Sequence, residues 1–104
     1  MSSYTPDRWV ILELTSGGAS HRRVLGGWHG GFAGADRWRL NSGIVHTRLN
    51  DGLYEFEGDS GSTYFCRKEL YGFNSLMASV LPAMRERNPE IDIRELTREE
   101  ILLN

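Results

Sequence analysis

A turn signal at residues 50–52, Asn-Asp-Gly, constrains the fold of this chain more than any other feature of its sequence. It lies between residues 44–49 and 53–57, two runs in which apolar and polar side chains alternate. Asp-Gly between alternating runs is among the strongest short-range signals for a β-hairpin, because both residues tolerate the positive φ angles of a tight turn. The sequence therefore predicts two antiparallel strands joined at this point.

The alternating pattern continues on both sides of the hairpin. Residues 37–40 alternate before it, and Gly43 is expected to break this strand, or to bulge it, before residues 44–49. Residues 58–61 supply another turn, and residues 62–67 alternate again. Residues 37–67 are therefore predicted to form an antiparallel meander.

Two further strands are predicted upstream. Residues 8–14 are almost continuously apolar and follow Pro6, which is typical of a central strand buried on both faces. Residues 21–28 form a second candidate, in which the pair at 26–27, Gly-Gly, interrupts the alternation and predicts a bulge or bend.

The pattern then changes to a helical period. From Phe73, apolar residues recur at i+3, i+4, i+7, i+8 and i+11, which predicts an amphipathic helix near 74–87, capped by Asn74 or Ser75. Pro82 conflicts with this helix because it lacks a backbone donor and clashes one turn back. Either the helix kinks there, or it ends just before the proline and a second turn begins.

The C-terminal part predicts two smaller elements. Residues 91–94 alternate and are expected to form an edge strand. Residues 97–100, Thr-Arg-Glu-Glu, form a capping box, so a short helix is expected to begin at Arg98. The predicted fold class is α+β: one twisted antiparallel sheet of five to seven strands, with the main helix packed on it and a short C-terminal helix. An SH3-like, partly open barrel is the alternative.

Length and composition set the broad class. The 104 residues predict a single domain over 1–104, and 39% hydrophobic with 25% charged residues is typical of globular proteins. No run approaches the roughly 20 apolar residues of a membrane span, and the N-terminus lacks the pattern of a secretory signal. With Cys66 as the single cysteine, these features predict a cytoplasmic protein with no membrane partner.

No pattern in the sequence favours catalysis or a cofactor. No two glycines stand two residues apart, which excludes the dinucleotide fingerprint, and Phe32 stands where a phosphate loop needs lysine. The three histidines and Cys66 are too scattered for a metal motif. Cys66 lies on an alternating strand and is predicted to be a core residue. We therefore predict no catalytic residue, cofactor, metal or nucleotide, with a small hydrolase as the least favoured alternative.

Charge and aromatic residues are unevenly distributed. Residues 1–50 hold six arginines and three acids, a net +3, whereas residues 51–104 hold six basic and eleven acidic residues, a net −5. The basic half also contains all three tryptophans. A sheet face of arginines and exposed aromatics can bind single-stranded nucleic acid through phosphates and bases. Alternatively, the tryptophans belong to the core and the arginines form the solvated opposite face.

The segment 38–44, WRLNSGI, and the segment 54–72, YEFEGDSGSTYFCRKELYG, resemble small uncharacterised proteins encoded by phages and prophages. The shared pattern is Trp-x-Leu-x-Ser-Gly, then Ser-Gly-Ser-x-Tyr-x-Cys, then Tyr-Gly. The resemblance implies a small accessory or inhibitor protein that binds a host or phage macromolecule, and it implies no particular site residue.

These observations favour a non-enzymatic binding module for a protein partner or for self-association as a homodimer, with nucleic-acid binding through the arginine and aromatic face as the alternative. Whether Trp28 belongs to the core or to a contact surface is open from the sequence. The candidate contact residues lie in the glycine-rich segment, on the basic strands and at the C-terminus: Trp28, His29, Phe32, Arg37, Arg39, Arg22, Arg23, Leu102 and Leu103.

Overall fold

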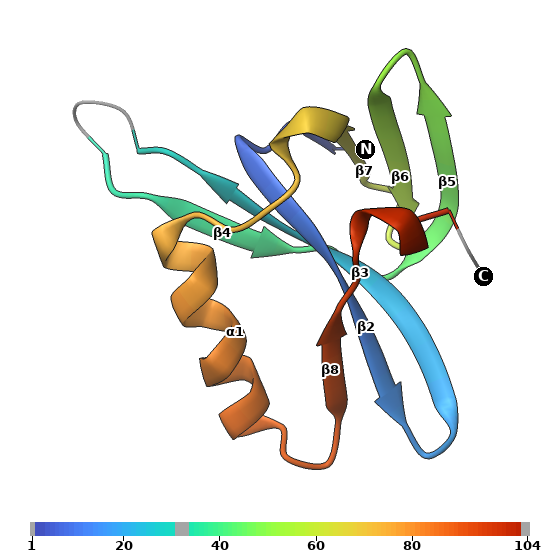
Figure 1. Ribbon diagram of the computed structural model, residues 1–104, viewed down its shortest axis with the longest axis vertical. Coiled ribbons are helices and arrows are strands. Elements are labelled where there is room, and N and C mark those ends of the chain that lie inside the picture. Colours follow the sequence, from blue (N-terminus) through green and yellow to red (C-terminus); the bar gives the residue numbers. More distant parts are fainter. Residues whose placement is uncertain (1, 31–33, 103–104) are drawn as a thin grey trace.

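The strands of the protein form two four-stranded sheets, with one main helix beside the second sheet (Figure 1). The computed structural model describes residues 2–30 and 34–102. The first sheet has the order β1 (Ser3–Tyr4), β7 (Thr63–Arg67), β6 (Leu53–Gly58), β5 (Ile44–Asn50). The second has the order β4 (Arg37–Leu40), β3 (Ala19–Trp28), β2 (Arg8–Ser16), β8 (Asp92–Glu95). The α+β class is confirmed, but the prediction of a single sheet of five to seven strands is wrong, and the strands do not close into a barrel.

The hairpin at residues 50–52 is confirmed. Asn50 pairs with Leu53 across the turn, and Asp51 and Gly52 have φ angles of 52° and 77°. Positive φ at both central residues is the geometry of the turns that match strand twist. β6 then pairs with β7 in antiparallel register, so the meander is confirmed from β5 to β7.

β4 does not belong to that meander, which corrects the predicted range of 37–67. It pairs with β3 in the second sheet. Asn41 extends this pairing, since its backbone N–H donates to the Val24 carbonyl at 2.9 Å and its side-chain Oδ1 accepts from the Val24 N–H at 2.8 Å. Gly43, at φ 145°, then leads the chain into the other sheet. The expected irregularity near Gly43 is a register shift between Ile44 and His46.

β2 is the central strand that the apolar run predicted. It lies between β3 and β8, and Trp9, Val10, Ile11 and Leu12 are all buried. β8 is an edge strand, as expected.

The predicted bulge at Gly26-Gly27 is wrong, because the register of β3 runs unbroken through both residues. The glycines instead admit close neighbours on the two faces of the strand. A Cβ atom on Gly27 would lie 2.6 Å from Met77 Sδ of the helix, and one on Gly26 would lie 3.0 Å from Pro6 Cβ. Close packing, rather than a change of register, therefore explains the lack of side chains there.

Helix α1 (Ser75–Arg87) is capped by Asn74, whose side chain accepts a hydrogen bond from the Met77 N–H at 2.8 Å. The helix continues through Pro82, so the alternative in which it ends before the proline is wrong. α1 contacts β3 and β4 and lies beside the second sheet in Figure 1. No helix among the described residues is long and apolar enough to cross a membrane.

The short C-terminal helix is a single 3₁₀ turn, η2 (Arg98–Glu100). As the capping box predicted, the Glu100 carboxylate accepts from the Thr97 N–H at 2.9 Å. A second 3₁₀ turn, η1 (Lys68–Leu70), follows β7.

The core is centred on Trp9. Its ring lies 5.4 Å from Tyr54, 5.4 Å from Phe56 and 4.7 Å from Tyr71, measured between centroids, and its indole N–H donates to the Arg67 carbonyl at 2.7 Å. Because Trp9 belongs to β2 while Tyr54, Phe56 and Arg67 belong to the first sheet, this side chain joins the two sheets.

Candidate partner-binding site

A groove lined by arginine and aromatic side chains follows β4. A hollow of about 520 Å³ is lined by Tyr4, Trp28, Arg37, Trp38 and Arg39. A neighbouring hollow of about 200 Å³ shares two of these residues, and its lining also includes Arg23, Ser42, Ser60, Ser62 and Tyr64. We call these two hollows together the arginine groove.

The pairing of β3 with β4 gives the groove its wall. Trp28 lies opposite Arg37 and Gly26 lies opposite Arg39, so these positions share one face of the sheet. The lack of a side chain at Gly26 leaves room for the Trp28 ring, since a Cβ atom there would lie 3.3 Å from it, closer than ordinary van der Waals contact. Trp38, opposite Gly27, projects from the other face, as the alternation predicted.

The N-terminal segment holds the aromatic rings in place. The Tyr4 ring lies 6.2 Å from the Trp28 ring in an edge-on arrangement and 5.0 Å from the Tyr64 ring. The Arg39 guanidinium lies 4.5 Å from the Tyr4 ring centroid, a cation–π geometry. The Trp28 indole N–H donates to the Thr5 carbonyl at 3.0 Å. Trp28 is half-buried and contributes both to the packing and to the groove.

The groove carries positive charge that the described part of the chain does not neutralise. Arg23, Arg37 and Arg39 form no ion pair with any described carboxylate; Arg23 donates only to the His21 ring, at 3.0 Å. The neighbouring Asp36 instead accepts from a backbone N–H, that of Gly30 at 3.0 Å. The guanidinium groups are therefore available to an anionic partner.

Tyr64 lines the smaller hollow of the groove. Burial raises the pKa of its hydroxyl to about 12, although the nearby Arg39 acts in the opposite direction. The phenol is therefore neutral at physiological pH and adds no negative charge beside the arginines. Ser42 and Ser60 line the same hollow, with their hydroxyl oxygens 3.1 Å apart.

Trp38 is 45% exposed because β4 is the last strand of its sheet. Its face borders a hollow of about 350 Å³ that is also lined by Val80 and Met84 of α1. The edge of the sheet thus has arginines on one face and an exposed tryptophan on the other.

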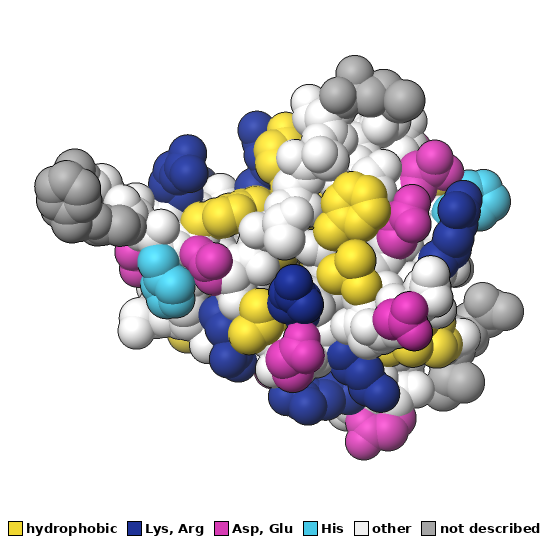
Figure 2. Space-filling model, turned by 90° about the horizontal axis from the view of Figure 1, so that it is seen from above, with side chains coloured by type: hydrophobic (Ala, Val, Ile, Leu, Met, Phe, Trp, Pro, Cys, Tyr) yellow, Lys and Arg dark blue, Asp and Glu magenta, His cyan; other side chains and the backbone are white. Residues whose placement is uncertain are grey.

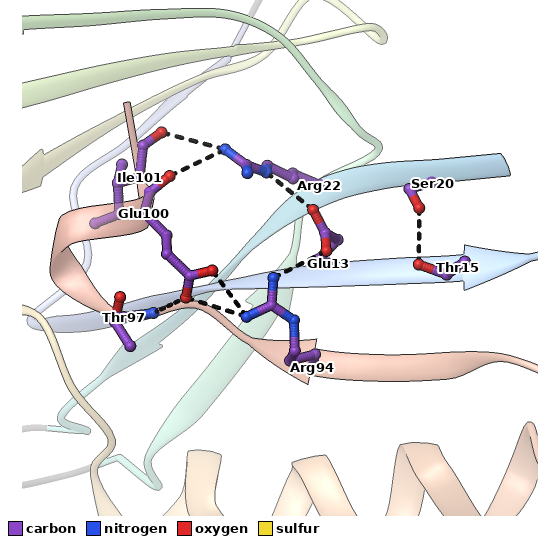
Figure 3. A network of polar contacts seen from close by, with 8 residues as sticks. All are labelled: Glu13, Thr15, Ser20, Arg22, Arg94, Thr97, Glu100 and Ile101. Carbon is purple, nitrogen blue, oxygen red and sulfur yellow. Dashed lines mark hydrogen bonds and ion pairs between the residues drawn. The ribbon is translucent and has the colours of Figure 1, made fainter. Parts of the chain in front are cut away.

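Arg22 lies outside the groove, in a network that fixes the C-terminal turn (Figure 3). It bonds the Glu13 carboxylate at 3.4 Å and the carbonyls of Glu100 and Ile101 at 3.3 and 3.4 Å. Arg94 lies beside it and reaches Glu13 at 3.1 Å and Glu100 at 2.9 Å. These contacts join basic and acidic halves of the sequence, and on the face shown in Figure 2 the basic and acidic side chains are interspersed.

The other predicted contact residues are dispersed. His29 is exposed, and its backbone N–H donates to Asp7 at 2.7 Å. Leu102 is 55% exposed and borders a separate hollow of about 440 Å³ beside β5. Phe32 and Leu103 lie outside the described residues.

Tyr4 is one of the groove residues that the sequence did not indicate; Tyr64, Ser42, Ser60 and Ser62 are others. Tyr4 stands in a two-residue strand that pairs in parallel with β7, a long-range contact without a local signal. The alternation at 37–40 correctly indicated Arg37 and Arg39 as neighbours on one face, but nothing near them pointed to a ring from the N-terminus.

Among the described residues there is neither an accessible cysteine nor a cluster of metal-ligating side chains. Cys66 is fully buried, and burial raises the pKa of its thiol, so the nucleophilic thiolate is disfavoured. No group of three or more His, Cys, Asp or Glu side chains in the described ranges is placed to hold a metal ion.

No protein-family model, curated protein or solved structure matches the chain. The chemistry of the groove is therefore the basis for a functional proposal.

Proposed function

We propose that the protein is a non-enzymatic module that binds a protein partner through the arginine groove. The observation that carries this proposal is the set of three arginines without carboxylate partners among the described residues, placed beside the half-buried rings of Tyr4 and Trp28. Arginine, tryptophan and tyrosine are the residues most enriched where binding energy concentrates in protein interfaces.

The groove is preorganised, which favours binding. Trp28 is held by its bond to Thr5, and Arg39 is held over the Tyr4 ring. Side chains that are already ordered lose less conformational entropy when a partner docks; each free, rotamer-rich side chain would cost about 0.5–1.5 kcal/mol to immobilise.

The distribution of charge favours a protein over a long polyanion. The chain has a net charge of −2, and its acidic side chains are interspersed with basic ones on the face in Figure 2. A long nucleic acid would extend beyond the groove over a chain of net negative charge, whereas a short acidic segment of a protein would contact the arginines alone.

Single-stranded nucleic acid is the second candidate, because the rings of Tyr4 and Trp28 lie beside Arg37 and Arg39 in one hollow. Bases would stack on the rings while phosphates contact the guanidinium groups. Such binding would weaken steeply as salt concentration rises.

The test is selection from a random peptide library displayed on phage, with immobilised protein as bait. We expect selected peptides to be rich in acidic residues and to lose at least tenfold in affinity for the variant Arg37→Glu/Arg39→Glu. The control is Arg67→Glu/Lys68→Glu, which reverses two exposed charges outside the groove and should retain binding. Circular dichroism of both variants checks folding.

A labelled oligothymidylate is titrated in parallel at low and high salt. If no peptide depends on Arg37 and Arg39 while the oligonucleotide does, the protein-binding proposal is wrong and the nucleic-acid candidate replaces it. If neither ligand depends on these arginines, the groove is not the binding surface.

A further inference from the structure

We infer that the partner contributes an extended acidic segment that binds as an additional strand on the free edge of β4. This inference rests on the proposed function and specifies its ligand. The argument combines three features of β4: an edge without a partner strand among the described residues, two arginines on one face, and an exposed tryptophan on the other.

The pairing register shows which backbone groups are free. The Asn41 N–H donates to Val24, and hydrogen-bonded pairs alternate along an antiparallel ladder. The next hydrogen-bonded pairs in the register are therefore Arg39 with Gly26 and Arg37 with Trp28. It follows that the N–H and C=O groups of Trp38 and Leu40 point away from β3, toward the open edge.

The other sheet edges are protected in ways that β4 is not. On β8, the Arg85 guanidinium donates to the Ile93 carbonyl at 3.1 and 2.8 Å and so occupies the edge. β5 carries the register shift between Ile44 and His46, and β1 has only two residues. Bulges, short strands and covered edges are the usual means of preventing strand addition.

The side chains of β4 specify the sequence pattern of the added strand. Arg37 and Arg39 are two residues apart, about 6.8 Å along a strand, and an added strand repeats at the same distance. Acidic residues at alternate positions would therefore face both arginines. The residue between them would lie on the face of Trp38, where the hollow beside Val80 and Met84 accepts an apolar side chain. The expected pattern is acidic, apolar, acidic.

A second copy of the chain does not fit this edge. Antiparallel pairing of β4 with its own copy would bring arginines together, and like charges across a strand pair are destabilising. Two runs of the chain itself have the pattern acidic, apolar, acidic. Glu55-Phe56-Glu57 lies inside β6, which is paired on both sides and buries Phe56. Glu90-Ile91-Asp92 leads into β8, where Ile91 packs against the core and Asp92 is already paired with Thr15 of β2. The complementary strand must therefore come from a different protein.

The experiment uses a labelled peptide, acetyl-Gly-Glu-Val-Glu-Val-Glu-Gly-amide, and two isomers with N-methylated backbones. In an antiparallel strand on the open edge, the peptide residue opposite Trp38 shares a hydrogen-bonded pair with it, so the valine N–H groups point toward β4 and the glutamate N–H groups point away; in a parallel strand the glutamate N–H groups would point toward β4 instead. Methylation of both valine nitrogens should reduce affinity at least tenfold. Methylation of two glutamate nitrogens, those of the first and the middle glutamate, should change it less than threefold. Binding is measured by fluorescence anisotropy and mapped by amide chemical shifts of Trp38 and Leu40.

A charge-swapped pair provides the second arm. A lysine version of the peptide should bind Arg37→Glu/Arg39→Glu and should fail to bind the unmodified protein. If binding requires Arg37 and Arg39 but both methylated isomers bind equally, strand addition is wrong and the proposed function stands. If the library yields no peptide that depends on the arginines, both the proposed function and this inference are wrong.

Discussion

The hydroxyl group of Tyr71 provides the most direct test of how the core is held together. It accepts a hydrogen bond from the Ile11 N–H at 3.2 Å and donates one to the Leu96 carbonyl at 2.6 Å. The Ile11 carbonyl also accepts from the Leu96 N–H at 2.9 Å, so the hydroxyl bridges two backbone groups that would otherwise pair directly. The replacement Tyr71→Phe removes this bridge without changing the ring.

The expected loss of stability follows from the two bonds. Each is worth about 1 kcal/mol net, and a buried group left without a partner costs about 1–3 kcal/mol. Both groups become unpaired in Tyr71→Phe, but partial closure of the gap between Ile11 and Leu96 would recover some of the loss. We therefore expect the free energy of unfolding to fall by about 2–4 kcal/mol.

Urea denaturation followed by tryptophan fluorescence measures this change, since the Trp9 ring packs on Tyr71. Tyr54→Phe is the matched control. Tyr54 also packs on Trp9 and is buried, but its hydroxyl makes no hydrogen bond with a described residue. Tyr54→Phe should cost less than about 0.5 kcal/mol. If the two variants lose equal stability at an unchanged m-value, the bridging role assigned to the Tyr71 hydroxyl is incorrect.

Three further predictions concern packing, pH and the cysteine. Gly27→Ala should destabilise the protein by about 1–3 kcal/mol in the same assay, because its methyl group would meet Met77; a neutral result would contradict the packing of α1 on β3. The hydrogen bond from the Thr97 N–H, and after it the bond from Arg94, lowers the pKa of Glu100 from its usual 4.5. The contribution of the Glu100 carboxylate to folding stability is therefore fully present above pH 4.5, and it is lost as the pH falls through the lowered pKa of the folded state. The stability difference between the unmodified protein and Glu100→Gln should therefore shrink from pH 6 to pH 3 in urea titrations, and a constant difference would contradict this. Burial raises the pKa of Cys66, so a thiol reagent should label it only at the rate of unfolding, whereas rapid labelling in native buffer would show that it is accessible.

The sequence predicted the elements whose signals are local. The 50–52 turn, the central strand at 8–14, the helix with its Asn74 cap and the capping box at 97–100 all depend on residues within one turn or strand. Each of these elements is specified by a turn geometry, a burial pattern or a helix cap, and each of these signals lies within one short segment of the sequence.

The division into two sheets could not be predicted in the same way. The alternation of apolar and polar side chains at residues 37–40 is compatible with pairing to either β5 or β3. The strand pairs with β3, and the long-range hydrogen bonds between Asn41 and Val24 extend that pairing. Similarly, the glycines at 26–27 suggested a bulge because a sequence cannot show that Pro6 and Met77 approach the strand there.

The candidate site was partly accessible from the sequence. Alternation placed Arg37 and Arg39 on one face, while the exposure of Trp38 depends on β4 being an edge strand, which is a property of the whole sheet. Arg22 and Arg23 are neighbours in sequence, yet one joins the network with Glu13 and the other lines the groove.

The position of Tyr4 would link the proposed binding in the arginine groove to the attachment of the N-terminal strand. Its backbone pairs with β7 of one sheet, while its ring supports Arg39 and Trp28 of the other. A ligand that requires this ring in place therefore binds only when the strand is attached, and by thermodynamic reciprocity its binding slows hydrogen exchange at residues 3–5. The affinity that is lost when residues 3–5 are truncated and the slowing of hydrogen exchange that the ligand causes at these residues should accordingly measure the same coupling free energy.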